Sequence, residues 1–271
     1  MNNPANSDVT EAYGLKFAFP SGDTVVGAFL RDYGEFSRVI GDLAVDLKGP
    51  FLDVGANIGT VALLAASRGI AVTAVEPHPG LAGLLRHNIE VNGFRNVQVI
   101  EAAAGEITGT ADFPIAPMEA SINFGSVGFG SNFPTRPVQM VTLDDIVPTR
   151  CAFVKIDVEG FELDVLRGAE NVLRIVRPVW LIEHHGADGS GEVLDILRSG
   201  DYILYWFFSP FVTPNSPRNG GATKILGDMN ILAVPKENSQ PKNITLIDPN
   251  RPRPTSTQSF PYLAQYGFSM D

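Results

Sequence analysis

A glycine loop and a carboxylate, one βαβ step apart, are the residues best suited to chemistry. The apolar run Phe51–Val54 breaks into Gly55-Ala-Asn-Ile-Gly59, and the next apolar run ends in Glu76-Pro77, about 20 residues after Asp53. In a βαβ unit such a loop and carboxylate meet at the carboxyl edge of a parallel sheet. An adenosine-containing cofactor could lie on the loop backbone there, with its ribose hydroxyls bonded to Glu76.

The charges of the loop distinguish between cofactors. A dinucleotide site favours G-x-G-x-x-G, but Ala56 and Asn57 occupy the place of the second glycine. Asp53 adds a negative charge, which disfavours a pyrophosphate and favours a sulfonium or an ammonium. The loop therefore predicts S-adenosylmethionine. The alternatives are a nicotinamide-dependent oxidoreductase on the same fold, or a purely structural turn.

Acidic residues end three further apolar runs, at Glu101, Asp157 and Glu183. Ligands of parallel sheets bind where strands end, so Asp157 is expected to face the cofactor's cationic end or to hold a substrate hydroxyl. As alternatives, Asp157 could cap the following helix and Glu162 could complement the dipole of its first turn.

The segment Glu183-His184-His185 supplies a candidate general base, because small shifts bring a histidine pKa close to neutrality. We assign His184 as the base and Asp157 as the residue that orients the hydroxyl. Two histidines beside two carboxylates also resemble a metal-ligand set, but no H-x-x-x-H or cysteine spacing supports one, so no metal is assigned.

Strand and helix patterns alternate along the chain and predict an α/β doubly wound fold. Seven strands are expected, most of them parallel, with helices on both faces of the sheet. They cover residues 51–54, 72–76, 97–101, 152–157, 179–183, 202–208 and 230–234. Helical spacing marks 58–68, 81–89, 165–176 and 193–197.

Three segments lie outside the minimal fold. The main domain is expected over residues 51–235. Before it, residues 1–50 are expected to form an N-terminal segment or lid. The insertion 105–142 is expected to hold a strand pair around a Gly- and Phe-rich stretch, 116–136, which is either a substrate loop or a surface excursion. The polar, proline-rich arm 236–271 has too few periodic apolar positions for a core element, and it could reach a second copy in a homo-oligomer.

Composition restricts the function. A formal charge of −10 and a pI near 4.9 argue against a general nucleic-acid partner. The single Cys151 cannot form an intramolecular disulfide. No apolar run marks a membrane span, and the polar start differs from a signal peptide, so the expected location is the cytoplasm.

The chain resembles the FkbM family of S-adenosylmethionine-dependent methyltransferases over about residues 13–236. The most specific block is Lys155-Ile-Asp-Val-Glu-Gly160. The other blocks are Gly34-Glu-Phe36, Leu52-Asp-Val-Gly-Ala-Asn-Ile-Gly59, Val75-Glu-Pro77, Leu143-Asp-Asp145, Leu166-Arg-Gly-Ala169 and Arg177-Pro178.

The resemblance implies a Rossmann-like class I methyltransferase fold and O-methylation of a hydroxyl on a sugar, a glycan or a secondary metabolite. It places the loop on the methionine portion, Glu76 on the ribose and residues 102–104 beside the adenine. The expected cofactor contacts are Asp53, Gly55, Ala56, Asn57, Gly59, Glu76, Pro77, Ala103 and Asp157. Glu159, Glu183 and Glu35 are assigned to the substrate. A non-catalytic protein that only binds S-adenosylmethionine is the remaining alternative.

Overall fold

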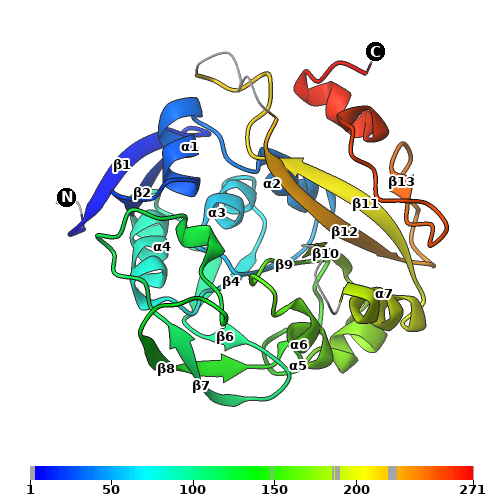
Figure 1. Cartoon of the computed structure of the whole chain (residues 1–271), viewed down its shortest axis with the longest axis horizontal. Helices are drawn as coiled ribbons and strands as arrows, with labels where there is room; N and C mark the ends of the chain where they lie inside the picture. Colours follow the sequence, from blue (N-terminus) through cyan, green and yellow to red (C-terminus); the bar gives the residue numbers. More distant parts are fainter. Residues whose placement is uncertain (1–3, 148, 185, 187–189, 219–224, 271) are drawn as a thin grey trace.

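An eight-stranded sheet runs through the centre of the computed structural model, which describes residues 4–147, 149–184, 186, 190–218 and 225–270 (Figure 1). Its strand order is β13-β11-β12-β10-β9-β3-β4-β5. The neighbours from β10 to β5 pair in parallel, whereas β12 is antiparallel to both β10 and β11. The α/β fold and the mostly parallel sheet are as predicted.

The seven strands expected from the sequence are all present, and β13 is the eighth. In chain order the strands of the large sheet are β3 (Phe51–Val54), β4 (Val72–Val75), β5 (Val97–Ile100), β9 (Phe153–Ile156), β10 (Val179–Glu183), β11 (Tyr202–Pro210), β12 (Gly227–Pro235) and β13 (Thr245–Leu246). The α-helices are α1 (Val26–Tyr33), α2 (Arg38–Asp46), α3 (Thr60–Ser67), α4 (Pro79–Val91), α5 (Leu143–Ile146), α6 (Glu162–Arg167) and α7 (Ser190–Ser199).

The connections reverse direction between β3 and β9. The chain passes outward from β3 to β4 and β5, and then returns to place β9 on the other side of β3. Phe51 and Phe153 begin these two central strands, and their stacked rings lie 5.0 Å apart in the core. A doubly wound sheet binds its ligand at such a reversal, beyond the carboxyl ends of the strands. The topology therefore predicts a ligand site at the carboxyl ends of β3 and β9.

The N-terminal segment begins with a hairpin that sequence patterns did not indicate, β1 (Ser7–Ala12) and β2 (Leu15–Pro20). Asn88 of α4 holds it: its Oδ1 accepts from the Ala18 N–H at 2.7 Å, and its Nδ2 donates to the carbonyls of Ala18 and Ile58 at 3.0 Å. The side chain is fully buried, so these bonds satisfy a polar group that would otherwise destabilise the core.

The insertion, with the two residues before it, forms a separate three-stranded sheet, β6-β8-β7, from Ala103–Ala104, Thr135–Val141 and Gly109–Pro114 (Figure 1). The predicted strand pair of the insertion is therefore correct. The stretch between β7 and β8 folds back over the main domain. It is tied to the segment before α1 by hydrogen bonds from the Thr24 N–H to the Ile122 carbonyl and from the Ile122 N–H to the Gly22 carbonyl.

The C-terminal arm contributes to the core, contrary to the expectation from its composition. Phe260 and Leu263 are almost fully buried, and the Tyr262 ring stacks on Phe207 of β11 at 4.9 Å. The Tyr262 hydroxyl also accepts from the Phe208 N–H and donates to its carbonyl. The arm folds as short 3₁₀ turns (Thr257–Ser259 and Pro261–Tyr266), so its apolar residues lack the α-helical period that the sequence pattern would reveal.

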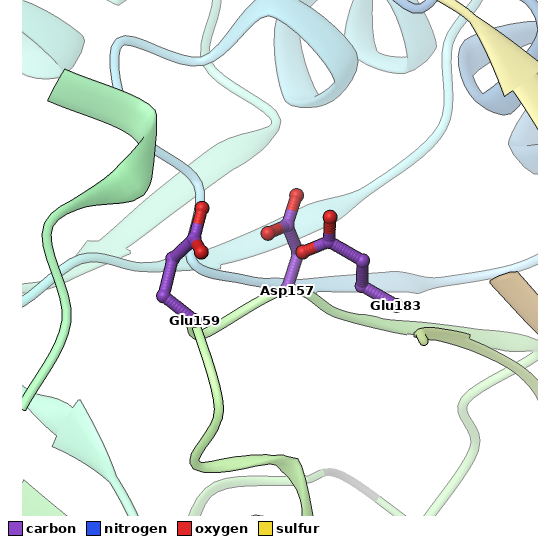
Figure 2. A group of neighbouring side chains, drawn as sticks. All are labelled: Asp157, Glu159 and Glu183. Atoms are coloured by element: carbon purple, nitrogen blue, oxygen red, sulfur yellow. The ribbon is translucent and has the colours of Figure 1, made fainter. Parts of the chain in front are cut away.

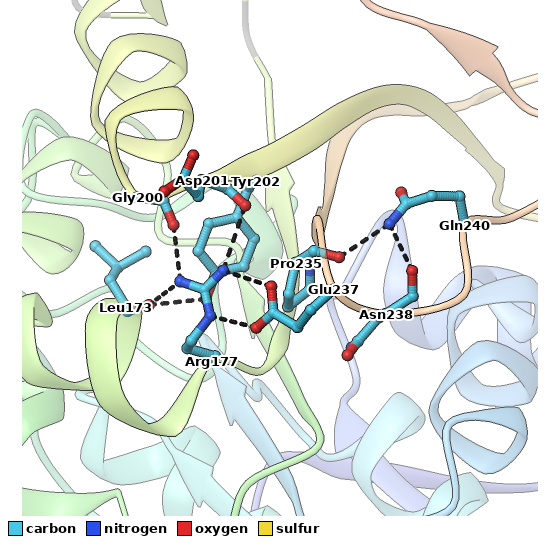
Figure 3. A network of polar contacts seen from close by, with 9 residues as sticks. All are labelled: Leu173, Arg177, Gly200, Asp201, Tyr202, Pro235, Glu237, Asn238 and Gln240. Carbon is cyan, nitrogen blue, oxygen red and sulfur yellow. Dashed lines mark hydrogen bonds and ion pairs between the residues drawn. The ribbon is translucent and has the colours of Figure 1, made fainter.

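Arg177 joins the end of the π-helical turn Val172–Val176 to the start of the arm (Figure 3). Its guanidinium pairs with both carboxylate oxygens of Glu237 and donates to the Gly200 carbonyl at 2.8 Å. It also lies 5.0 Å from the centre of the Tyr202 ring. Such a fork of donors suits arginine and not lysine, so the Arg177-Pro178 block has a structural role.

Within the described residues, none of the helices combines the length and the apolar character that crossing a bilayer requires.

Candidate functional site

A cavity opens at the carboxyl ends of β3 and β9, where the topology predicts it. Residues at or just after the ends of β3, β4, β5, β9 and β10 line it, together with residues of α1, α2, the insertion and β12. Of the expected cofactor residues, Asp53, Gly55, Ala56, Asn57, Glu76, Pro77, Ala103 and Asp157 all line it. Glu159 and Glu183 line it as well, whereas Glu101 does not and pairs with Arg86 at the surface.

The glycine loop is shaped by two close approaches. A Cβ on Gly55, where φ is +79°, would lie 1.8 Å from the Asp157 carbonyl oxygen, so only glycine lets β3 and β9 end side by side. Gly59 does not line the cavity. Its φ is +90°, and a Cβ there would overlap Leu85 and Leu63, so this glycine allows α3 to pack against α4.

Glu76 holds the loop through both of its oxygens. Its Oε2 accepts from the Asn57 N–H at 2.8 Å, and its Oε1 accepts from the His78 N–H at 2.9 Å. The pKa of Glu76 is raised to about 7, because burial raises it by more than these two N–H donors lower it. Each oxygen retains a second lone pair, so the carboxylate can also accept from two ribose hydroxyls.

His78, which sequence patterns did not single out, connects the loop to the insertion. Its Nδ1 accepts from the N–H groups of Gly80 and Leu81 at the start of α4, and its Nε2 lies 2.8 Å from the Ala116 carbonyl. Because Nδ1 accepts, Nε2 must carry the proton and donate it to Ala116, so the ring is neutral. Burial lowers the pKa of His78 in agreement with this state.

The insertion closes the cavity on the side of Ala103. Phe129 packs edge-on against Phe113 at 5.1 Å and lies 4.4 Å from Phe161, and all three rings line the cavity. Asn123 and Phe124 line it as well. Part of the stretch 116–136 therefore lines the cavity, and with Phe113 and Phe161 it gives this side an apolar, aromatic wall.

Lys155 is a buried cation between two carboxylates at the strand ends. Its Nζ lies 3.0 Å from Asp157 Oδ2 and 3.4 Å from Asp53 Oδ1. Burial lowers the pKa of Lys155, but the charges of Asp157 and Asp53 outweigh it and the pKa is raised overall. Among the described residues, Asp53 Oδ1 has no hydrogen-bond donor although it is enclosed. The Lys155 ammonium is therefore the cation that compensates this enclosed oxygen.

Asp157, Glu159 and Glu183 direct their carboxylates toward one another, as Figure 2 shows. One oxygen of each lies within 4.8 Å of the others, which is close enough for all three to share a cation or a hydroxyl donor. Burial and the charge of Asp157 raise the pKa of Glu159 to about 8, and they also raise the pKa of Glu183. Glu159 has a φ of 55°, an uncommon backbone conformation for a residue other than glycine.

Glu162 takes the local structural role expected of a first-turn acid. Its Oε1 accepts from the N–H groups of Val158 and Gly160. Asp157 does not cap α6, whose N-cap is Phe161 and has no side-chain cap bond. The Asp157 carboxylate is thus directed to the cavity and not to the helix.

Besides Gly59, two further sequence assignments do not fit the cavity. Glu35 is fully buried but does not line it: its Oε1 accepts from the Thr213 N–H at 2.6 Å, so it holds the segment carrying Phe211, which does line the cavity. His184 does not line the cavity either, and its ring lies 5.1 Å from that of Trp206. The β10 strand points Glu183 inward and therefore turns its neighbour away. His185 lies outside the described residues.

Asp228 and Asn230 were not predicted as site residues, although both line the cavity from β12. Asn230 pairs with Glu183 across the strands, and Asp228 lies two residues earlier on the same strand face. They reach the cavity because β12 pairs antiparallel with β10, and no pattern in the local sequence predicts that pairing. Burial, together with the charge of Asp157, raises the pKa of Asp228.

Comparison with known proteins agrees with this geometry. Residues 53–204 match the family model of the methyltransferase FkbM domain. The hexuronic acid methyltransferase AglP of Haloferax volcanii is 30% identical over 168 residues, covering 56% of this chain and 68% of that protein. The uncharacterized protein MJ1452 of Methanocaldococcus jannaschii is 37% identical over 80 residues, 28% of this chain and 30% of that protein.

A crystal structure of methyltransferase FkbM from Methylobacillus flagellatus is similar in fold, with a TM-score of 0.43 and 21% identity. The similarity covers 68% of this chain and 43% of that one, so the chain spans less than half of that protein.

Proposed function

Because the chain belongs to the FkbM methyltransferase family and its cofactor is S-adenosylmethionine, we propose that it methylates a hydroxyl oxygen of a sugar, a glycan or a secondary metabolite. The observation that carries this proposal is the continuity of the cavity: Glu76 and the glycine loop lie at one part of it, and the carboxylates Asp157, Glu159 and Glu183 at another. Family membership sets aside the nicotinamide-dependent alternative.

The residues present fit the cofactor. Glu76 can accept from the ribose hydroxyls, and the acidic side chains of Asp53 and Asp157 on the cavity wall suit the cationic end of the cofactor. The apolar wall that includes Ala103, Phe113 and Phe129 suits adenine. When bound, S-adenosylmethionine supplies an electrophilic methyl group on a cationic sulfur, which departs as a neutral thioether.

In our account the acceptor oxygen forms a bond to the methyl carbon as the carbon–sulfur bond breaks, and the hydroxyl proton passes to a carboxylate. Glu159 replaces His184 as the proposed base, because Glu159 lines the cavity and its pKa of about 8 is close to neutral conditions. Asp157, held by Lys155, orients the hydroxyl. The insertion and α1 exclude water, which strengthens these contacts.

Incubation of the purified chain with methyl-labelled S-adenosylmethionine and fractionated glycans tests the proposal. We expect labelled product, a large loss of turnover in Glu159→Gln with nearly unchanged affinity for S-adenosylhomocysteine, and near-normal turnover in His184→Ala. Cofactor binding without transfer to any hydroxylated acceptor would instead favour the non-catalytic alternative. Normal turnover in Glu159→Gln together with loss of turnover in His184→Ala would instead identify His184 as the base.

A further inference from the structure

A pair of aromatic residues lines the cavity on the side of β11. Phe36 lies between α1 and α2, Phe211 directly follows β11, and both residues line the cavity. Their rings are stacked with centroids 5.0 Å apart, and both residues are half-buried. Aromatic side chains that border a cavity supply much of the contact area of a bound ligand. Neither residue is assigned to the cofactor, so the pair is a candidate for contact with the acceptor.

The strand order places Phe211 on the side of the cavity opposite to the ribose carboxylate. β11 pairs with β12 and β12 with β10, so these strands lie beyond β9 and β3 from Glu76, which ends β4. Ser209 pairs with Asp228, and Phe211 lies two positions beyond Ser209 on the same strand face. The pairing extends this far, because the Phe211 N–H donates to the Leu226 carbonyl at 2.9 Å. Phe211 and Asp228 therefore border the same part of the cavity.

Hydrogen bonds from outside the cavity hold the backbone of both aromatic residues. The Tyr13 hydroxyl accepts from the Phe36 N–H at 2.6 Å and donates to the Phe36 carbonyl at 2.7 Å. The Ser37 N–H donates to the Phe211 carbonyl at 3.0 Å. The fully buried Glu35 accepts from the N–H two residues beyond Phe211. These bonds hold the pair in place before a ligand arrives, which reduces the entropy lost on binding.

Hydrogen-bonding groups lie beside the aromatic pair. Asp157, Glu159 and Glu183 have carboxyl oxygens within 4.8 Å of one another (Figure 2), and Asp228 lines the same cavity. A carboxyl group accepts from a hydroxyl whether it is ionised or protonated. A ligand that uses both features needs an apolar face and several hydroxyls. A pyranose ring has this form, because C–H bonds cover its faces and its hydroxyls lie mostly around its edge.

We propose that Phe36 and Phe211 form an acceptor platform, on which a pyranose ring rests one C–H face while its hydroxyls reach the carboxyl groups. Tyr13 and Glu35 are positioning residues, because they hold the platform and do not line the cavity. This inference rests on the proposed function, since it takes the methylated group to be a hydroxyl bound at this end of the cavity. Among the proposed acceptors, it selects a sugar ring over a metabolite without one.

Saturation-transfer NMR tests the platform on the full chain with S-adenosylhomocysteine bound. The probes are methyl β-D-glucopyranoside, methyl β-D-galactopyranoside and methyl α-D-mannopyranoside. Galactitol is the control probe, because it carries hydroxyls but no ring. We expect saturation of at least one glycoside, strongest at the C–H protons of one ring face, and little saturation of galactitol.

Matched variants identify the rings that bind the glycoside. Phe36→Leu and Phe211→Leu keep an apolar side chain but lose the aromatic face, so each should weaken the glycoside affinity, measured by titration of the signal, at least about threefold. Phe208→Leu is the control: Phe208 is also half-buried and stacks on Phe260, but it does not line the cavity. The affinity for S-adenosylhomocysteine, measured by calorimetry, should stay within about threefold of the native value in all three variants.

If either platform variant fails to bind S-adenosylhomocysteine, Phe36→Tyr and Tyr13→Phe replace it. Phe36→Tyr keeps an aromatic face and should retain the native affinity for the glycoside. Tyr13→Phe keeps its own ring but loses the hydroxyl that holds Phe36, so it should bind the glycoside more weakly and S-adenosylhomocysteine as before.

Absence of saturation in all three glycosides with the native chain would overturn the platform. Glycoside affinity that is unchanged in Phe36→Leu, Phe211→Leu or Tyr13→Phe, where these bind S-adenosylhomocysteine, would overturn it as well. Failure of the native chain to bind S-adenosylhomocysteine would overturn the proposed function itself, which keeps the two failures distinguishable.

Discussion

Lys155 and Asp157 form an ion pair of 3.0 Å at the end of β9, inside a cavity whose other charged lining residues, among those described, carry carboxyl groups. The same Nζ lies 3.4 Å from Asp53 Oδ1. The lysine therefore compensates charge at the ends of both central strands, and the buried part of the site depends on it.

Replacing Lys155 by Met should destabilise the chain strongly, because Asp53 would remain buried without a partner. Loss of one member of a buried pair typically costs about 3–5 kcal/mol. Urea denaturation measures this loss as a lower free energy of unfolding. Lys236→Met is the control, since Lys236 pairs with Asp201 at the surface and should change stability little. Similar small losses for both variants would contradict the role given to Lys155.

Gly55→Ala should prevent β3 and β9 from ending side by side, because the new Cβ would overlap the Asp157 carbonyl oxygen. Gly69 has a comparable φ of +85° but nothing within 4 Å of its Cβ position, so Gly69→Ala isolates the conformational cost of about 1 kcal/mol. We expect Gly55→Ala to lose several kcal/mol more and to lose affinity for S-adenosylhomocysteine. Equal effects on the free energy of unfolding would show that the overlap is relieved without cost.

Stability of the chain without ligand should depend on pH through Glu159. Its pKa is raised from about 4.5 to about 8, so between these values the native chain retains a proton that the unfolded chain has released. The free energy of unfolding therefore falls as pH rises through this window. Relative to the native chain, Glu159→Gln should become progressively more stable between about pH 5 and pH 8.5. If the free energies of unfolding of the native chain and of Glu159→Gln changed equally with pH over this range, the raised pKa of Glu159 would be contradicted.

Substitutions at His78 should separate two roles of this side chain: its bond to the insertion and its N-cap of α4. Asn is a favoured N-cap residue, so His78→Asn should retain the cap while losing the bond to the Ala116 carbonyl. We expect faster amide hydrogen exchange in residues 116–129 and weaker binding of S-adenosylhomocysteine, with stability better preserved than in His78→Ala, which also loses the cap. Unchanged exchange in His78→Asn would show that other contacts hold the insertion.

The sequence was sufficient for the strands that position the cofactor. Buried parallel strands such as Phe51–Val54 are continuous apolar runs, and a glycine or an acid marks each end. The arm was misjudged because Phe260, Tyr262 and Leu263 fill gaps in the core without a regular period.

Within the site, local sequence patterns did not predict the residues whose neighbours are set by pairing between distant strands. Asp228 reaches the cavity through the return of β12, and alternation along β10 selects Glu183 over His184. Lys155 carried a signal that could have been used: a lysine within an apolar strand requires buried acids beside it.

The chemical nature of the product bond tests the central claim most directly. After transfer from methyl-labelled S-adenosylmethionine, the labelled product is treated with mild alkali. A methyl ether on a neutral or amine-bearing sugar resists this treatment, whereas a methyl ester of a uronic acid releases labelled methanol. Our account predicts label that stays on the acceptor and whose formation is lost in Glu159→Gln. Release of the label as methanol would show that a carboxylate is methylated and would contradict it.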